Sequence, residues 1–141
     1  AVVIGKTCSH FKKENSMEYI FGYTCINDVT DETMFKEDVI WARGKGCDTF
    51  APLGPVVVTD EIDPENAMLK TVLNGKVVQN MNTSDMHFHI PALIEFISQY
   101  ITLEAGDIIA TGTPVGVGCL HPGDLVEVSI EGIGTLRNPV K

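Results

Sequence analysis

Residues 68–81 read MLKTVLNGKVVQNM, and this stretch decides the fold class. Two runs rich in β-branched and other apolar residues, Met68 to Leu73 and Lys76 to Met81, flank the dipeptide Asn74-Gly75. Asn-Gly readily adopts the positive φ angles of a two-residue type I′ turn, which makes it the strongest short signal for a β-hairpin. The sequence therefore predicts two antiparallel strands joined by a tight turn.

The segments on either side of this hairpin also favour strands. Only residues 90–100 have the apolar spacing of a sizeable helix, with Pro91 in the first turn. Residues 31–38 suggest a short helical turn, and residues 43–47 a glycine-rich loop. Strands are expected at 1–5, 19–26, 54–59, 107–111, 125–130 and 134–140, the last two paired across Glu131-Gly132-Ile133. Strands and helices do not alternate, so a compact, mainly β sandwich or roll is favoured over a doubly wound parallel sheet.

Composition limits the classes of function. The chain has 141 residues, 44% of them hydrophobic and 21% charged, which suits one domain with its own core. Its net charge of −9 argues against nucleic acid as a partner, and no apolar run reaches the roughly 18 residues of a membrane span. The four cysteines are scattered without C-x-x-C spacing, which favours reduced thiols and a cytoplasmic location.

Asp28 is the first candidate for chemistry. It follows an apolar strand and stands next to Asn27, ahead of a loop. A carboxylate at such a strand end can bind a hard cation such as Mg²⁺, which prefers a few carboxylates together with waters and substrate oxygens. The same position also suits an aspartate that only caps a strand or turn, and spacing alone leaves both interpretations open.

Lys45 is the second candidate, in WARGKGCDTF at 41–50. A lysine between two glycines has a flexible backbone and little steric cover, so it can reach an anion. Trp41 and Phe50 provide apolar anchors at the two ends of the segment. A solvated surface lysine is the alternative interpretation.

The third candidate is the stretch TGTPVGVG at 111–118. Its glycines, Gly112 among them, let backbone amides approach a carboxylate, and Thr113 adds a hydroxyl donor. The stretch lacks the Gly-Lys-Ser/Thr of a Walker loop, and a purely structural turn is the alternative. Two weaker signals, the alternating His87 and His89 and the acidic residues 60–65, are more typical of ordinary surface positions than of a site.

Together these motifs resemble one family. The ordered series GYTCINDVT, W-x-R-G-K-G-x-D-T-F, the NGK hairpin followed by Gln79, ITLEAGDIIATGTPVGVG and LVEVSIEGIGTLRN is similar to the C-terminal catalytic domain of the fumarylacetoacetate hydrolase family. The resemblance runs from Ala1 to Val140 and implies one catalytic domain over residues 1–141. It also implies that family's mixed β-sandwich roll and a homodimer.

The resemblance implies a function as well. In that family three carboxylates hold Mg²⁺ or Mn²⁺, and Asp28 matches the third of them. Lys45 matches the active-site lysine, and Thr113, with Gly112 beside it, matches the threonine that receives the substrate carboxylate. The expected substrate is a 2-oxo or acylpyruvate-type dicarboxylic acid. The expected reaction is isomerisation, decarboxylation or hydrolysis through a metal-stabilised enolate, as in the breakdown of aromatic compounds.

The sequence departs from the family pattern in two places. The Glu-x-Glu that supplies the other two carboxylates is expected immediately upstream of Ala1, so we expect this chain to lack the segment that carries them. After Asp28, many members have an arginine and a glutamine where this chain has Glu32 and Phe35. These departures motivate an alternative, a non-catalytic subunit of such an enzyme that is kept for assembly or ligand binding.

Overall fold

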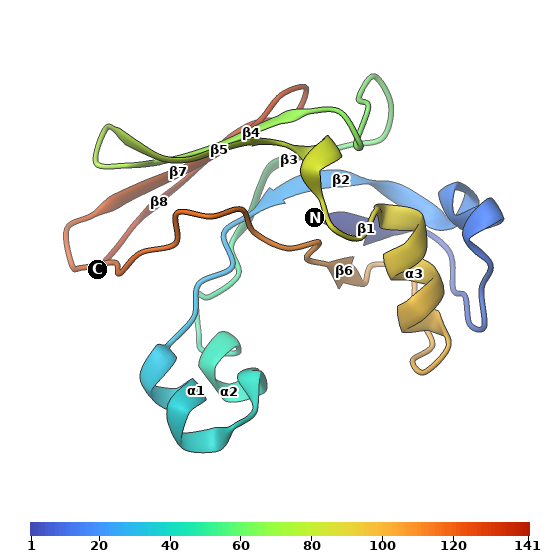
Figure 1. The fold of residues 1–141 in the computed structure, drawn as a ribbon, viewed down its shortest axis with the longest axis horizontal. Coiled ribbons are helices and arrows are strands. Elements are labelled where there is room, and N and C mark those ends of the chain that lie inside the picture. Colours follow the sequence, from blue (N-terminus) through green and yellow to red (C-terminus); the bar gives the residue numbers. More distant parts are fainter.

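The computed structural model describes all 141 residues and contains two four-stranded antiparallel sheets that stack on each other (Figure 1). The strand order in the first sheet is β3-β2-β1-β6, and in the second it is β5-β4-β7-β8. The first sheet consists of β1 (Val2–Ile4), β2 (Ile20–Ile26), β3 (Leu53–Val58) and β6 (Ile108–Ile109). The second consists of β4 (Met68–Leu73), β5 (Lys76–Asn82), β7 (Leu125–Ile130) and β8 (Gly134–Pro139).

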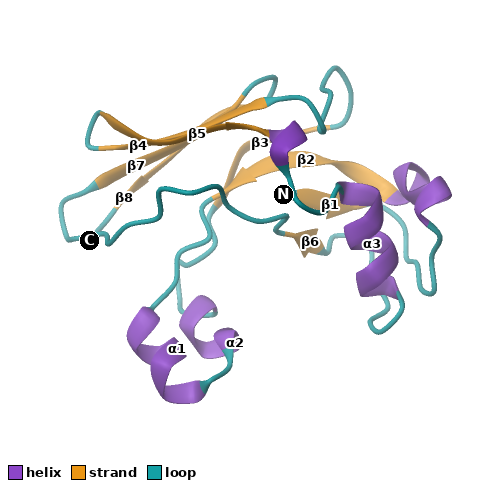
Figure 2. Cartoon of the chain, viewed as in Figure 1, coloured by secondary structure: helices purple, strands orange, loops and turns teal.

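Helices make up the smaller part of the chain (Figure 2). The helix α3 (Ile90–Ser98) packs beside the first sheet, whereas α1 (Glu32–Asp38) and α2 (Trp41–Lys45) form a helical hairpin that projects from the end of β2 (Figure 1). Two 3₁₀ segments, Lys13–Tyr19 and Thr83–Asp85, complete the set. The predicted β-sandwich with one main helix is confirmed.

The predicted hairpins are also confirmed. Strands β4 and β5 pair from Leu73↔Lys76 to Met68↔Asn82, with Asn74 at φ 51° and Gly75 at φ 80° in the turn. Strands β7 and β8 pair across residues 131–133 as expected. The strand predicted at 107–111 is shorter than expected, because only Ile108 and Ile109 pair with β1 and the chain then leaves the sheet toward Gly112 at φ 119°.

The core lies between the two sheets and under α3. Val2, Cys25 and Val126 are almost fully buried, and Ile94 of α3 is completely buried. Burial of each such aliphatic side chain contributes about 1.5–3 kcal/mol to folding. The core thereby fixes the end of β2 and the start of the loop that follows it, which carry Asp28.

Helix α3 ends at Ser98, two residues before the predicted end. The Ser98 hydroxyl is buried, donates to the Glu95 carbonyl at 3.1 Å and accepts the Phe11 N–H at 3.1 Å. At the other end, the Glu65 carboxylate accepts the Ile90 N–H at 3.0 Å and so supplies the cap that His89 does not. No helix has both the length and the apolar character that crossing a membrane would require.

Candidate functional site

The α1–α2 hairpin brings Lys45 back to the end of β2. Asp31 caps α1, because its side chain accepts the N–H groups of Thr33 at 2.8 Å and Met34 at 3.0 Å. The Asp31 N–H in turn donates to the Gly44 carbonyl at 2.8 Å, which joins the start of α1 to the last turn of α2. Residues 28–31 and 44–45 therefore lie side by side.

The glycine-rich loop predicted at 43–47 is wrong, since Trp41–Lys45 forms a short helix. Arg43 holds this helix against α1 by ion pairs with Asp38 and with Glu37, the latter at 2.9 Å. These hydrogen bonds, the one with Asp38 first, raise the pKa of Arg43. Gly44 permits the contact because a Cβ there would lie 2.9 Å from the Asp31 carbonyl oxygen. Lys45 is thus the last residue of a helix that tertiary contacts hold in place.

Asp28 and Lys45 form an ion pair. Lys45 Nζ lies 2.5 Å from Asp28 Oδ2 and donates a second hydrogen bond of 3.1 Å to Thr30 Oγ1. The two charged side chains are 38% and 34% exposed, so the pair is open to a ligand from solvent. The Asp28 Oδ1 atom makes no hydrogen bond within the chain and is free to accept one or to bind a cation.

Thr113 and Gly112 lie in the turn that follows β6. The Gln79 side chain, buried on β5, donates 2.9 Å hydrogen bonds to Thr113 Oγ1 and to the Pro114 carbonyl. Gly116 packs on the same strand at φ 106°, where a Cβ would lie 2.0 Å from the Val78 carbonyl oxygen. The turn is therefore fixed to β5 at two points.

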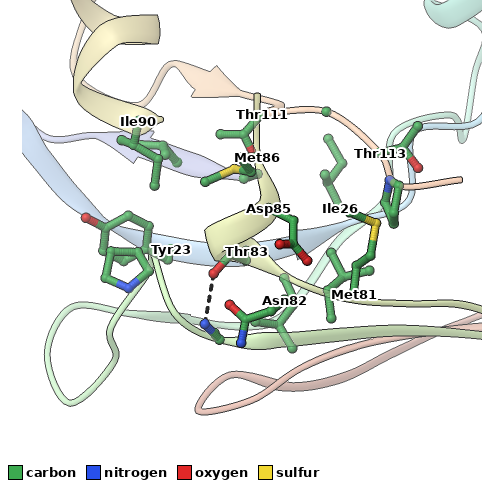
Figure 3. Close-up of a pocket in the computed structure, with 18 of the residues that line it drawn as sticks. Tyr23, Ile26, Met81, Asn82, Thr83, Asp85, Met86, Ile90, Thr111 and Thr113 are labelled. Carbon is green, nitrogen blue, oxygen red and sulfur yellow. Dashed lines mark hydrogen bonds between the residues drawn. The ribbon is translucent and has the colours of Figure 1, made fainter. Parts of the chain in front are cut away.

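A cavity of about 430 Å³ lies beside this turn, with mostly apolar walls (Figure 3). Its lining includes Thr111, Gly112 and Thr113 from the turn, Ile26 from β2, and Asp85 from the 3₁₀ segment after β5. Asp28 and Lys45 are absent from the lining, although Ile26 precedes Asp28 by two residues. The structure thus pairs Asp28 with Lys45 outside the cavity, whereas Thr113 and Gly112 share the cavity wall with Ile26 at the end of β2.

The acidic residues of this chain do not form a complete cation site. No group of three or more His, Cys, Asp or Glu side chains converges in the structure. Asp28 is accordingly one carboxylate with one open oxygen, which suits a single ligand to a hard cation whose other ligands are waters, substrate oxygens or groups outside these residues. His89 lies at the start of α3, where its Nδ1 is 2.7 Å from the Glu65 carboxylate.

Sequence reasoning missed three contacts that shape the site. Thr30 accepts the second hydrogen bond of Lys45, and Gln79 holds Thr113. Phe35 stacks on Trp41 with ring centroids 3.8 Å apart. Glu32 is exposed and pairs with Lys36 at 3.5 Å. The position of Gln79 after the NGK hairpin was the one sequence signal that pointed to any of them.

The two stacked four-stranded sheets define a mainly β sandwich domain. The chain belongs to the fumarylacetoacetate hydrolase family, since the family model for the fumarylacetoacetate (FAA) hydrolase C-terminal domain matches residues 1–141. It is 44% identical over 149 residues to the oxaloacetate tautomerase YisK of Bacillus subtilis, covering 99% of this chain and 50% of that protein.

Solved structures agree with this assignment. The 5-carboxymethyl-2-hydroxymuconate delta-isomerase from Mycobacterium smegmatis superposes with a TM-score of 0.95 at 47% identity, covering 99% of this chain and 55% of that one. Maleylpyruvate hydrolase from Sphingobium sp. SYK-6, in complex with manganese(II) ion and pyruvate, gives a TM-score of 0.89 at 35% identity, covering 99% and 51%. These relatives include an isomerase, a hydrolase and a tautomerase, and the chain spans about half of the length of each.

Proposed function

We propose that this chain is the acid-binding and cation-binding part of an enzyme that acts on a 2-oxo or acylpyruvate-type dicarboxylic acid through an enolate. The observation that carries the proposal is the contact of Lys45 with Asp28 and Thr30 at the end of β2. Support also comes from the family relatives, which catalyse tautomerisation, isomerisation and hydrolysis. Isomerisation and acylpyruvate hydrolysis fit these residues equally well.

Each residue has a role in this proposal. The open Oδ1 of Asp28 is a ligand for Mg²⁺ or Mn²⁺, which when bound supplies Lewis-acid polarisation of the keto acid. Lys45 places positive charge where the enolate oxygen develops its negative charge. The Thr113 hydroxyl and the Gly112 backbone orient the substrate carboxylate, and Gln79 holds that turn still. The choice of a divalent cation is supported by the manganese and pyruvate in maleylpyruvate hydrolase.

The apolar cavity beside Thr113 fits the body of such a substrate. Its volume of about 430 Å³ lies within the usual range of small-molecule sites, and polar residues of its lining include Thr111 and Thr113 in the turn and Asp85. An acid bound by its carboxylate at the turn would therefore direct its carbon chain against apolar walls.

The test uses the full-length protein that carries this chain. After chelation, Mg²⁺ or Mn²⁺ is added back, and three assays are run: enol–keto conversion of oxaloacetate, cleavage of an acylpyruvate and isomerisation of a hydroxy-dienedioate. Asp28→Asn should abolish cation-dependent turnover, whereas Asp48→Asn, which changes an exposed aspartate after the same hairpin, should retain it. No turnover in any assay, or full turnover in Asp28→Asn, would favour the alternative of a non-catalytic subunit.

A further inference from the structure

Trp41 is the only tryptophan of the chain, and it contacts two side chains of the α1–α2 hairpin. The Lys45 ammonium lies 5.4 Å from the centroid of the Trp41 ring, within the range of a cation–π interaction. The Phe35 ring stacks on Trp41 at 3.8 Å between centroids, with 27° between the two ring planes. Trp41 is 51% exposed, so one part of its ring is open to solvent on the hairpin surface.

The helix register explains why these groups meet. Trp41 and Lys45 are the first and fifth residues of α2, and residues four apart on a helix lie on the same face. Arg43 lies between them in sequence and points instead to Glu37 and Asp38. Lys36 pairs with Glu32. Of the basic side chains in the α1–α2 hairpin, Lys45 is therefore the one that faces Asp28.

We propose that Trp41 is a positioning residue, which holds the Lys45 ammonium beside Asp28 and so sets where the substrate oxygen binds. This proposal rests on the proposed function. It also assigns Phe35, which occupies a position where a polar glutamine was expected, to the support of the Trp41 ring.

The physical argument concerns the freedom of a lysine side chain. A free lysine loses about 2 kcal/mol of rotamer entropy when it is held in one geometry, so a partly exposed lysine needs several restraints. Asp28 and Thr30 take two of the three N–H donors of the ammonium. The Trp41 ring attracts the charge electrostatically without displacing Asp28 or Thr30, so the third N–H has no hydrogen-bond acceptor within the chain and can serve a substrate oxygen.

Steady-state kinetics of the full-length protein test whether Trp41 positions the Lys45 ammonium. Trp41→Leu should lower kcat about fivefold, the change that about 1 kcal/mol produces, with a much smaller change in KM. Trp41→Phe keeps an aromatic face and should restore kcat to within about twofold of the wild type. Tyr100→Leu, which removes an exposed aromatic ring after α3, is the matched control and should leave kcat unchanged. Equal kcat values for the Leu and Phe variants would overturn the proposal.

Fluorescence gives a second readout that does not depend on turnover. The Trp41 signal is isolated as the difference between wild type and Trp41→Phe, and pyruvate is the probe. Pyruvate binding should change this emission because its negative charge beside the Lys45 ammonium alters the electric field at the Trp41 ring, and Lys45→Met should lose the change. Unchanged emission, while calorimetry records pyruvate binding, would overturn the proposal.

The two proposals fail in different ways. If the proposed function is wrong, the wild type itself shows no cation-dependent turnover of the three substrates. If only the positioning role of Trp41 is wrong, the wild type turns over and Trp41→Leu matches it.

Discussion

The buried side chain of Gln79 ties strand β5 to Thr113, because its Nε2 donates a 2.9 Å hydrogen bond to the Thr113 hydroxyl. Its Oε1 accepts a 2.6 Å hydrogen bond from the Thr71 hydroxyl on β4. Gln79 Nε2 also donates to the Pro114 carbonyl, so the position of Thr113 is coupled to the β4–β5 hairpin of the second sheet.

Gln79→Leu should therefore affect both stability and binding. The substitution keeps the volume but leaves the buried Thr71 hydroxyl without its acceptor and frees Thr113. We expect a loss of about 1–3 kcal/mol in the free energy of unfolding, measured by urea denaturation, and a higher KM for the acid substrate. Asn80→Leu, which removes an exposed amide from the neighbouring position on β5, is the control. An unchanged KM in Gln79→Leu would show that the Thr113 turn keeps its shape without this bond.

Gly44→Ala should displace Lys45. The added methyl would lie 2.9 Å from the Asp31 carbonyl oxygen and 3.4 Å from the Phe35 nitrogen, and backbone cannot yield as a flexible side chain can. We expect a loss of about 1–3 kcal/mol in the free energy of unfolding and a lower kcat/KM, since the Asp31–Gly44 hydrogen bond would open. Thermal unfolding and steady-state kinetics measure the two effects.

The control for this prediction is Ala42→Ser, which adds one heavy atom at an exposed position of the same helix. It should change neither quantity. If Gly44→Ala behaves like Ala42→Ser, the close contact between α1 and α2 does not position Lys45.

Sequence patterns predicted those parts of the fold that local chemistry determines. Asn74-Gly75 fixed one hairpin because a two-residue turn with two positive φ angles admits few other sequences. The pattern failed at α2, since Arg-Gly-Lys-Gly favours a loop locally. The helix forms there through tertiary contacts, namely the ion pairs of Arg43 and the packing of Gly44 on Asp31.

In the candidate site, too, the sequence predicted some features and missed those that depend on tertiary contacts. Asp28, Lys45 and Thr113 each stood out from the sequence only weakly, and the resemblance to a family, not their spacing, brought them together. Asp28 and Lys45 are 17 residues apart, and their contact depends on the turn between α1 and α2. The support of Trp41 by Phe35 depends on ring packing across that turn, which residue spacing does not encode.

Asp124 should make stability depend on acid pH. Its carboxylate accepts a 2.7 Å hydrogen bond from the Asn74 side chain and a 2.8 Å bond from the His121 N–H, and these bonds, the Asn74 one first, lower its pKa below the ordinary 3.8. The unfolded chain therefore binds more protons than the folded chain just below pH 4. The contribution of the ionised Asp124 carboxylate to the free energy of unfolding is present above about pH 4. It is lost as the pH falls through the pKa that Asp124 has in the folded chain.

Asn74→Gly tests this prediction, because glycine tolerates the turn geometry but removes the hydrogen bond. Urea midpoints between about pH 5 and pH 2 should fall less steeply in the variant than in the wild type. Asp124→Asn, which cannot titrate, should show the same flattening. Parallel curves for all three proteins would mean that Asp124 makes no net contribution.

Cys25 should make stability depend on alkaline pH, with the opposite sign. Its side chain is fully buried between the sheets, and burial raises the pKa of its thiol above the ordinary 9.0, despite opposing hydrogen bonds from the backbone of Ile130 and Leu136. Above about pH 9 the unfolded chain releases the Cys25 proton while the folded chain retains it. The folded state then binds more protons, so stability falls as the pH rises.

Under reducing conditions, Cys25→Ala should start with lower stability at pH 7, because it leaves a small cavity, but lose less between about pH 8 and pH 10.5 than the wild type. Cys119→Ala removes an exposed thiol and should keep the wild-type dependence. If Cys25→Ala and the wild type lose the same amount over this range, ionisation of other groups, with Tyr23 the first to test because burial also raises its pKa, accounts for the alkaline unfolding.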